Sequence, residues 1–350
     1  MANRPNKLAL FLAGTIILAA VFWLAFRQTY SSFTPPALPV PNGYDQLIQA
    51  AKMIPPRTGF YKEMGEEELA TIVEQNKPAL KLVQEALQKP CGVPVDWSRD
   101  PASGIAQKYL DDVSSLRDLA RALSADMRND FASGKAAEAV PSGLTIFQLG
   151  SNCYRGGLMI DNLIGLAIQG VAINELRNVA VQVPETKTEI MAGLLPMLET
   201  GEPTEDVLQR EIDYIHSGPR SISGMMVRLK AGSLLEPAVQ AARQASLRTT
   251  TQQRLFLLHL AVNIYHDQNG KWPESLYELA PSILPTIFID PYSNGAFIYR
   301  VENENYLLYS VGQNKRDDGG TGDESGLAAD FVDDFILEAP PADQPEQPER

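Results

Sequence analysis

Acidic side chains cluster in a glycine-rich loop near the C-terminus, where they can bind a metal ion. Asp317, Asp318, Asp323 and Glu324 are spaced by glycines between positions 313 and 326. Ca²⁺ takes about six to eight oxygen ligands from a loop that folds tightly around it, so carboxylates interspersed with glycine are suitable material. The loop can therefore form a calcium site, and the alternative is a solvated acidic loop without metal.

A second candidate is a pair of charges inside the most apolar stretch that follows the N-terminal region. Arg155 and Asp161 interrupt the segment Ser142–Asn178, which is otherwise rich in Leu, Ile, Val and Gly. A charge in such surroundings is costly unless it is paired. We predict that the two side chains face each other across a turn, as an internal structural pair or as a binding or active-site pair.

Residues typical of catalytic motifs are scarce. The histidines are His216, His259 and His266, and the last two are seven residues apart, too distant along a helix to hold one metal without further ligands. No H-E-x-x-H, G-x-S-x-G, P-loop or G-x-G-x-x-G motif occurs. The two cysteines, Cys91 and Cys153, can form one bridge in an exported protein or remain free thiols. We therefore expect a protein that is not an enzyme.

The N-terminal region, residues 1–30, has the pattern of a membrane anchor. Residues 8–26 are nineteen uncharged, mostly apolar residues, long enough as a helix to cross a hydrocarbon layer of about 30 Å. Arg4 and Lys7 precede this segment and predict a cytoplasmic N-terminus, with the bulk of the chain outside, on the periplasmic side. A cleaved signal peptide is the alternative.

Composition shifts divide the rest of the chain. Residues 31–43 contain four prolines and predict an extended spacer. The net charge of −13 makes nucleic acid an unsuitable partner. Most of that charge lies after position 316, where eleven acidic residues face one arginine. Residues 338–350 read as a disordered acidic tail.

Residues 44–235 show helical periodicity almost throughout and predict a multi-helix domain. Asp45 is the expected cap of the first helix. The apolar segment should form two helices around Gly156–Gly157, or one bent helix. The other predicted helices cover residues 66–88, 107–132, 185–198, 204–216 and 221–230.

Residues 236–337 predict a small α+β module with a short antiparallel β-meander. A helix should begin at Glu236–Pro237 and end at Asn269–Gly270. Two β-type runs, 296–301 and 306–311, are joined by Glu302–Asn305 as a hairpin. A third strand is expected at 331–337.

The order of motifs in this module resembles the C-terminal half of the major pseudopilin of type II secretion systems. The resemblance rests on Gly-Lys-Trp-Pro at 270–273, Asp290-Pro291-Tyr292, the β-type runs and the acidic loop, about a fifth of the chain. It implies that Asp317, Asp318 and Asp323 bind Ca²⁺. Pseudopilins also carry a Gly cleavage site and a Glu five residues into the apolar helix, whereas residues 1–62 contain no Glu.

The sequence thus predicts a mainly α protein with an N-terminal transmembrane helix, a multi-helix ectodomain and a pseudopilin-like C-terminal module. The expected function is that of a membrane-anchored interaction or scaffold protein of the cell envelope, associated with a type II secretion or pilus-like system and with protein partners there. The alternatives are a divergent pseudopilin or secretion component proper, and an envelope hydrolase that uses the helical domain.

Overall fold

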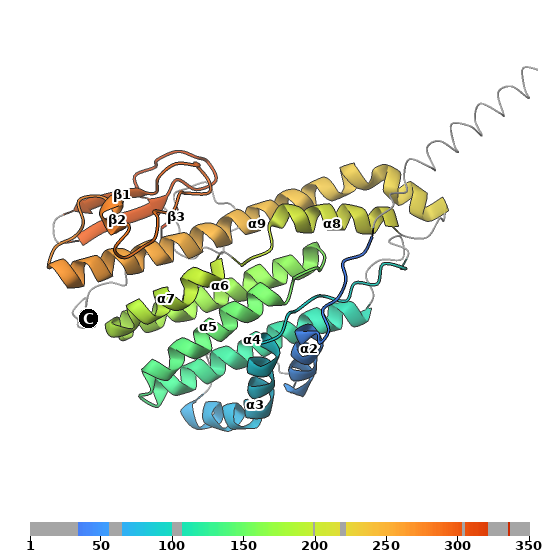
Figure 1. The fold of residues 1–350 in the computed structure, drawn as a ribbon, viewed down its shortest axis with the longest axis horizontal. Helices are drawn as coiled ribbons and strands as arrows, with labels where there is room; N and C mark the ends of the chain where they lie inside the picture. The colour runs from blue at the N-terminus through green and yellow to red at the C-terminus, as the bar shows by residue number, and fades with distance from the viewer. Residues whose placement is uncertain are drawn as a thin grey trace, which may run out of the picture.

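The computed structural model describes residues 34–55, 65–99, 107–198, 200–217, 222–302, 305–320 and 335–336. This part of the chain is mainly helical, with a small antiparallel sheet near the C-terminus (Figure 1). The helices are α2 (Gly43–Met53), α3 (Glu66–Leu87), α4 (Gln107–Ala132), α5 (Ala136–Asn152), α6 (Met159–Gln182), α7 (Lys187–Leu198), α8 (Thr204–Ser217) and α9 (Ile222–Asn269), with short 3-10 turns η3 (Pro184–Thr186) and η4 (Leu276–Leu279). The strands are β1 (Ile298–Glu302), β2 (Asn305–Ser310) and β3 (Phe335–Ile336).

In the described ranges, no helix combines the length and the apolar character needed to cross a membrane. The predicted anchor at residues 8–26 and the predicted tail at 338–350 lie outside those ranges.

The apolar segment forms two helices rather than one bent helix. Helix α5 ends at Asn152 and α6 begins at Met159, and Gly156 between them has a φ of 70° that favours glycine. The two helices cross closely because they meet at Gly150 and Gly165. A Cβ on Gly150 would lie 2.8 Å from the carbonyl oxygen of Gly165.

The predicted cap of the first helix is wrong. The side chain of Asn42, not that of Asp45, accepts a hydrogen bond of 3.1 Å from the Tyr44 amide at the start of α2. Asp45 lies inside the first turn, where its negative charge still suits the positive end of the helix dipole.

Helix α9 is continuous for 48 residues, about 72 Å at 1.5 Å per residue. The predicted helix start at Glu236–Pro237 is wrong because α9 begins at Ile222 and Pro237 lies inside it. The predicted domain boundary between residues 235 and 236 also falls within α9. The predicted end is confirmed: α9 stops at Asn269, and Gly270 follows with a φ of 67°.

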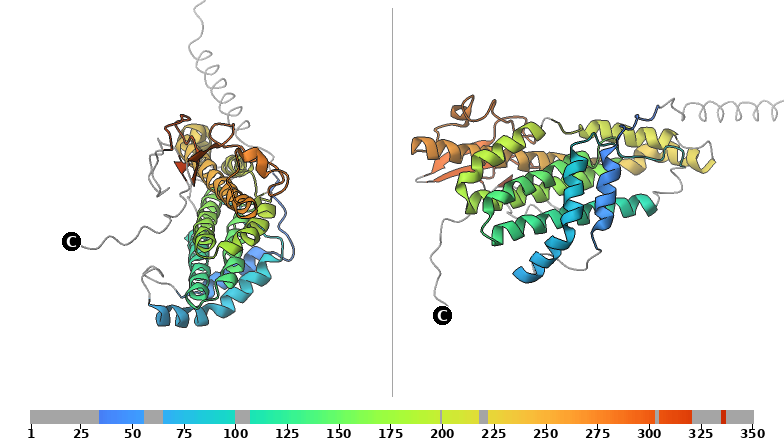
Figure 2. Two further views of the ribbon diagram at one scale, coloured as in Figure 1. Left: turned by 90° about the vertical axis from the view of Figure 1, so that its left-hand side faces the viewer. Right: turned by 60° about the horizontal axis from the view of Figure 1, so that its bottom comes forward.

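The sheet lies against the C-terminal half of α9 (Figures 1 and 2). The predicted hairpin is confirmed, with Val301 opposite Tyr306 in the antiparallel pair β1–β2. The third strand forms over two residues, Phe335 opposite Ser310 and Ile336 opposite Tyr309. We call residues 270–320, which carry η4, β1 and β2, the tip.

One hydrophobic core connects the bundle to the tip. A single cluster of buried side chains extends from Tyr44 in α2 through α4, α5, α6 and α9 to Leu308 in β2. The helices that surround α5 and α6 and the sheet on α9 therefore pack around a shared interior.

Candidate functional site

The turn between α5 and α6, residues 153–158, carries one of the predicted charges. Arg155 donates through Nε to Oδ1 of Asn152 at 3.0 Å and through its terminal nitrogen to the Thr200 carbonyl at 2.5 Å. Glu202 accepts a hydrogen bond of 3.1 Å from the Gly156 amide. Arg210 in α8 binds Glu202 and donates to the Gly157 carbonyl at 2.7 Å. The turn is thus clamped by charges from the loop before α8 and from α8 itself.

Asp161 belongs to a separate, buried group at the N-terminus of α6. Its side chain is 2% exposed and accepts hydrogen bonds from the Tyr109 hydroxyl and, at 2.7 Å, from the Leu158 amide. Burial raises the pKa of Asp161 to about 7, against the lowering effect of these two hydrogen bonds. Among the residues that the structure describes, its Oδ1 atom has no hydrogen-bond partner. Glu211 lies beside it and accepts from the Met159 amide at 2.8 Å, and burial raises the pKa of Glu211 as well.

Arg155 and Asp161 therefore bind different partners rather than each other. The guanidinium reaches the loop at Thr200, and the carboxylate reaches Tyr109 in α4. Sequence reasoning missed Tyr109, Glu202 and Arg210 as partners. Each lies in a segment with ordinary helix or loop composition, so no local signal distinguishes them.

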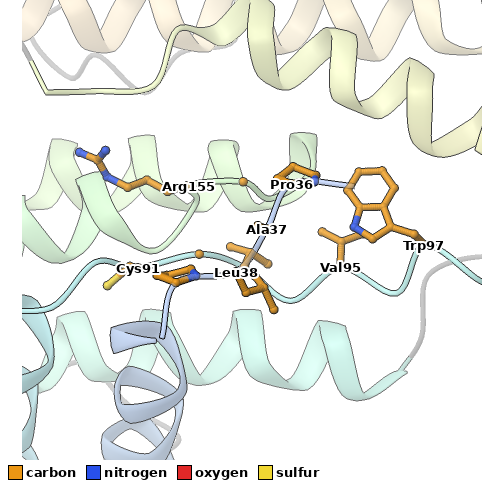
Figure 3. Close-up of a pocket in the computed structure, with 11 residues that line it drawn as sticks. Pro36, Ala37, Leu38, Cys91, Val95, Trp97 and Arg155 are labelled. Atoms are coloured by element: carbon orange, nitrogen blue, oxygen red, sulfur yellow. The ribbon is translucent and has the colours of Figure 1, made fainter. Parts of the chain in front are cut away.

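A cavity of about 260 Å³ opens beside the turn. Figure 3 shows Arg155 at one end and Trp97 at the other, with Pro36, Ala37 and Leu38 crossing between them. The remaining lining residues are Pro39, Cys91, Gly92, Val93, Val95 and Gly156. Asp161 is not among the residues that line the cavity, so Arg155 and Asp161 do not face one bound molecule there.

The end of the predicted spacer forms one wall of this cavity. Asn42 donates to the Gly92 carbonyl at 2.8 Å and accepts from the Gly92 amide at 3.0 Å. A Cβ on Gly92 would lie 2.9 Å from Pro39, so the two segments are in close contact. Residues 34–42 thus run along the loop 90–97, and this part of the spacer is fastened to the body.

The cysteines near the cavity are not activated nucleophiles. Both thiols are free and buried. Burial raises the pKa of Cys91 to about 11, although Arg155 opposes the shift, and burial also raises the pKa of Cys153. Both thiols stay protonated near neutral pH, whereas a nucleophilic cysteine needs the thiolate form.

No family model, curated protein or solved structure matches the chain.

A buried carboxylate holds the Asp290-Pro291-Tyr292 motif in its turn conformation. Asp290 is fully buried and accepts hydrogen bonds from the Tyr292 amide at 3.0 Å and the Ser293 hydroxyl at 3.0 Å. It also accepts from the Ser310 hydroxyl at 2.8 Å and the Val311 amide at 3.4 Å, at the end of β2. One side chain thus ties the turn before the sheet to the end of its central strand.

The structure describes two of the three predicted calcium ligands, Asp317 and Asp318. Both form hydrogen bonds with other side chains of this chain. Asp317 accepts from the Tyr309 hydroxyl at 2.6 Å and binds Arg300 at 3.0 Å. The hydrogen bond from Tyr309 is the main reason that the pKa of Asp317 lies below its usual value. Asp318 accepts from Asn314 at 2.6 Å, and Asp323 lies outside the described residues. Within those residues, no group of three or more potential metal-ligating side chains comes together.

The two histidines of α9 have different surroundings. His259 is half-buried, and its Nδ1 atom lies 2.6 Å from the Tyr306 hydroxyl. His266 stacks on Trp272 with ring centroids 3.9 Å apart. The two rings therefore serve the packing of the tip on α9 at separate points.

Proposed function

We propose that the protein is a non-enzymatic, membrane-anchored envelope protein that acts as an interaction or scaffold module. Residues 8–26 would anchor it in the cytoplasmic membrane, with the N-terminus inside and the bulk of the chain on the periplasmic side. The observation that carries the proposal is the continuity of α9, which spans the bundle and supports the tip within one core. A partner bound at the tip would therefore be held in a fixed position relative to the bundle.

Apolar side chains on the surface of the tip can form the contact with such a partner. Tyr277 is 73% exposed, Ile289 is 52% exposed and Val301 is 45% exposed. Aromatic and aliphatic side chains supply most of the binding energy at the centre of protein interfaces. We assign the partner-binding surface to the tip on this basis, with a protein of the envelope as the partner.

Photo-cross-linking in intact cells tests this assignment. With p-benzoylphenylalanine at position 277 of the full chain, we expect one discrete adduct with an envelope protein, and we expect Val301→Glu to weaken it at least about tenfold because a buried interfacial charge is costly. Position 171, an exposed valine on α6, is the matched control and should give no such adduct. If the adduct forms equally at both positions, or survives Val301→Glu unchanged, the tip is not the binding surface.

A second candidate is a secretion component proper, and the geometry of the C-terminal module favours it. A long helix carries a small antiparallel sheet, which agrees with the order of elements that the resemblance to pseudopilins implies. Asp290 also joins the D-P-Y turn to the end of β2. A pseudopilin is processed at its N-terminus. An intact-mass measurement separates the two candidates, because a chain that retains Met1 cannot be a processed pseudopilin.

Calcium binding by Asp317, Asp318 and Asp323 is part of the proposed pseudopilin-like character of the module. A ligand that binds only the folded state at a hundredfold excess over its Kd stabilises that state by about 2.7 kcal/mol. We expect a rise of this order in the free energy of unfolding with calcium relative to chelator, and its loss in Asp317→Ala. Arg300→Gln should enhance calcium binding, since Arg300 occupies the same carboxylate. Equal stability with and without calcium in the parent chain would reject the site.

A further inference from the structure

A second cavity, of about 240 Å³, lies between the bundle and the tip. Helices α6 and α9, the start of α7 and strand β2 all contribute to its wall. The lining residues are Arg177, Ala180, Val181, Pro184, Lys187, Phe256, His259, Leu260, Asn263, Trp272, Asn305 and Tyr306. Within the described part of the chain, this lining contains two cations and no carboxylate, in a protein whose net charge is −13.

The two cations differ in whether a carboxylate of the protein pairs with them. Lys187 is 13% exposed and binds Asp267 at 2.9 Å, and the Asp267 carboxylate is itself 56% exposed to solvent. Arg177 makes no hydrogen bond or ion pair with any residue that the structure describes. A guanidinium in a cavity wall without a counter-ion is suited to a carboxylate, because its fork of N–H groups can bind both carboxylate oxygens at once.

Neutral polar groups also line the cavity, in addition to the two cations. The Tyr306 hydroxyl lies 2.6 Å from Nδ1 of His259 and accepts from Asn263 at 2.8 Å. The pKa of His259 falls to about 4, chiefly through burial and further through the charges of Lys187 and Arg177. The imidazole is therefore uncharged at neutral pH, and Arg177 and Lys187 supply the positive charge.

Apart from Asn305, the rest of the wall is apolar. Trp272 stacks on His266 and lies 4.8 Å, centroid to centroid, from Tyr306. The lining also includes Phe256 and Leu260 from α9. Sites for drug-sized ligands begin at about 300 Å³, so a cavity of about 240 Å³ restricts the ligand to a small molecule.

We propose that this cavity binds a small organic carboxylate. The carboxylate group binds Arg177 and Lys187, and the apolar body of the ligand packs against Trp272. The site is distinct from the exposed apolar surface of the tip, so this inference stands or falls independently of the scaffold proposal.

Calorimetric titration of the purified full-length chain tests the proposal with matched pairs of probes. The pairs are acetate with acetamide, benzoate with benzamide, and hexanoate with hexanamide, and inorganic sulfate tests for a simple anion site. We expect at least one of the two larger carboxylates to bind at least about tenfold more tightly than its amide, and also more tightly than acetate and sulfate. Arg177→Gln should weaken that binding at least tenfold. This variant should fold normally because Arg177 has no partner among the described residues.

Two controls locate the site. Arg117→Gln removes an exposed arginine of α4 and should leave the affinity unchanged. Ligand-induced changes in tryptophan fluorescence should persist in Trp97→Phe and disappear in Trp272→Phe. The proposal is overturned if every carboxylate binds no better than its amide, if sulfate matches the best carboxylate, or if Arg177→Gln retains full affinity.

Discussion

Replacing Asp290 with alanine is expected to lower the free energy of unfolding by roughly 3–5 kcal/mol, the range seen when a buried charge loses its partners or leaves them unsatisfied. The carboxylate is fully buried and accepts four hydrogen bonds. Its removal would leave the Ser310 hydroxyl and the Val311 amide without their acceptor at the end of β2. Urea unfolding followed by the fluorescence of Trp272, which lies in the tip, measures the effect.

The control for this prediction is Glu302→Ala, which removes an exposed carboxylate at the end of β1. Surface substitutions of this kind usually change stability by less than about 0.5 kcal/mol. Asp290→Asn keeps one acceptor oxygen and should fall between the parent chain and Asp290→Ala. If Asp290→Ala is no more destabilising than the control, the carboxylate is not what joins the turn to β2.

Asp161 is expected to make the protein less stable as the pH rises from about 4 to about 7. Its pKa is about 7 in the folded state and has an ordinary value of 3.8 in an unfolded chain, so between these values the folded state holds a proton that the unfolded state has released. The stabilisation from that proton is complete below pH 4 and is lost as the pH rises through 7. A difference of about three pH units corresponds to something on the order of 4 kcal/mol.

Asp161→Asn isolates this contribution. The asparagine oxygen can still accept from Tyr109 and from the Leu158 amide, but it carries no charge to desolvate. The variant should match the parent chain near pH 4 and exceed its unfolding free energy at pH 8. Asp111→Asn, an exposed carboxyl on the same helix as Tyr109, should leave the pH dependence unchanged. Parallel stability curves for the parent chain and Asp161→Asn would contradict the assignment.

Local chemistry made much of the secondary structure predictable. The apolar spacing between residues 107 and 132 predicted α4 with the bounds that the structure shows. The turn residues Glu302–Asn305 predicted the position of the hairpin, and Asn269–Gly270 predicted the end of α9. These features depend on side-chain periodicity, turn propensity and the left-handed conformation of glycine, which are all properties of a short stretch of chain.

The helix start predicted at Glu236–Pro237 is wrong because the helix continues through the proline in spite of a local penalty. Proline inside a helix costs about 3 kcal/mol or more through a lost hydrogen bond and a steric clash. Helix α9 packs against α8 and α6 as well as the sheet, and tertiary contacts of this kind override local helix propensity. The short stretch of sequence around Pro237 gives no information about those neighbouring elements.

The sequence by itself determined the number and extent of most helices, the hairpin, and the positions of the charges that interrupt apolar segments. Only the tertiary structure decided what those charges bind. Arg155 meets a carbonyl 45 residues away and Asp161 meets a hydroxyl 52 residues away. The cavity around Arg177 and His259 is lined by residues of α6, η3, α7, α9 and β2. Helix and turn preferences act over a few residues, whereas the partner of a buried charge is fixed by which distant elements share its part of the core.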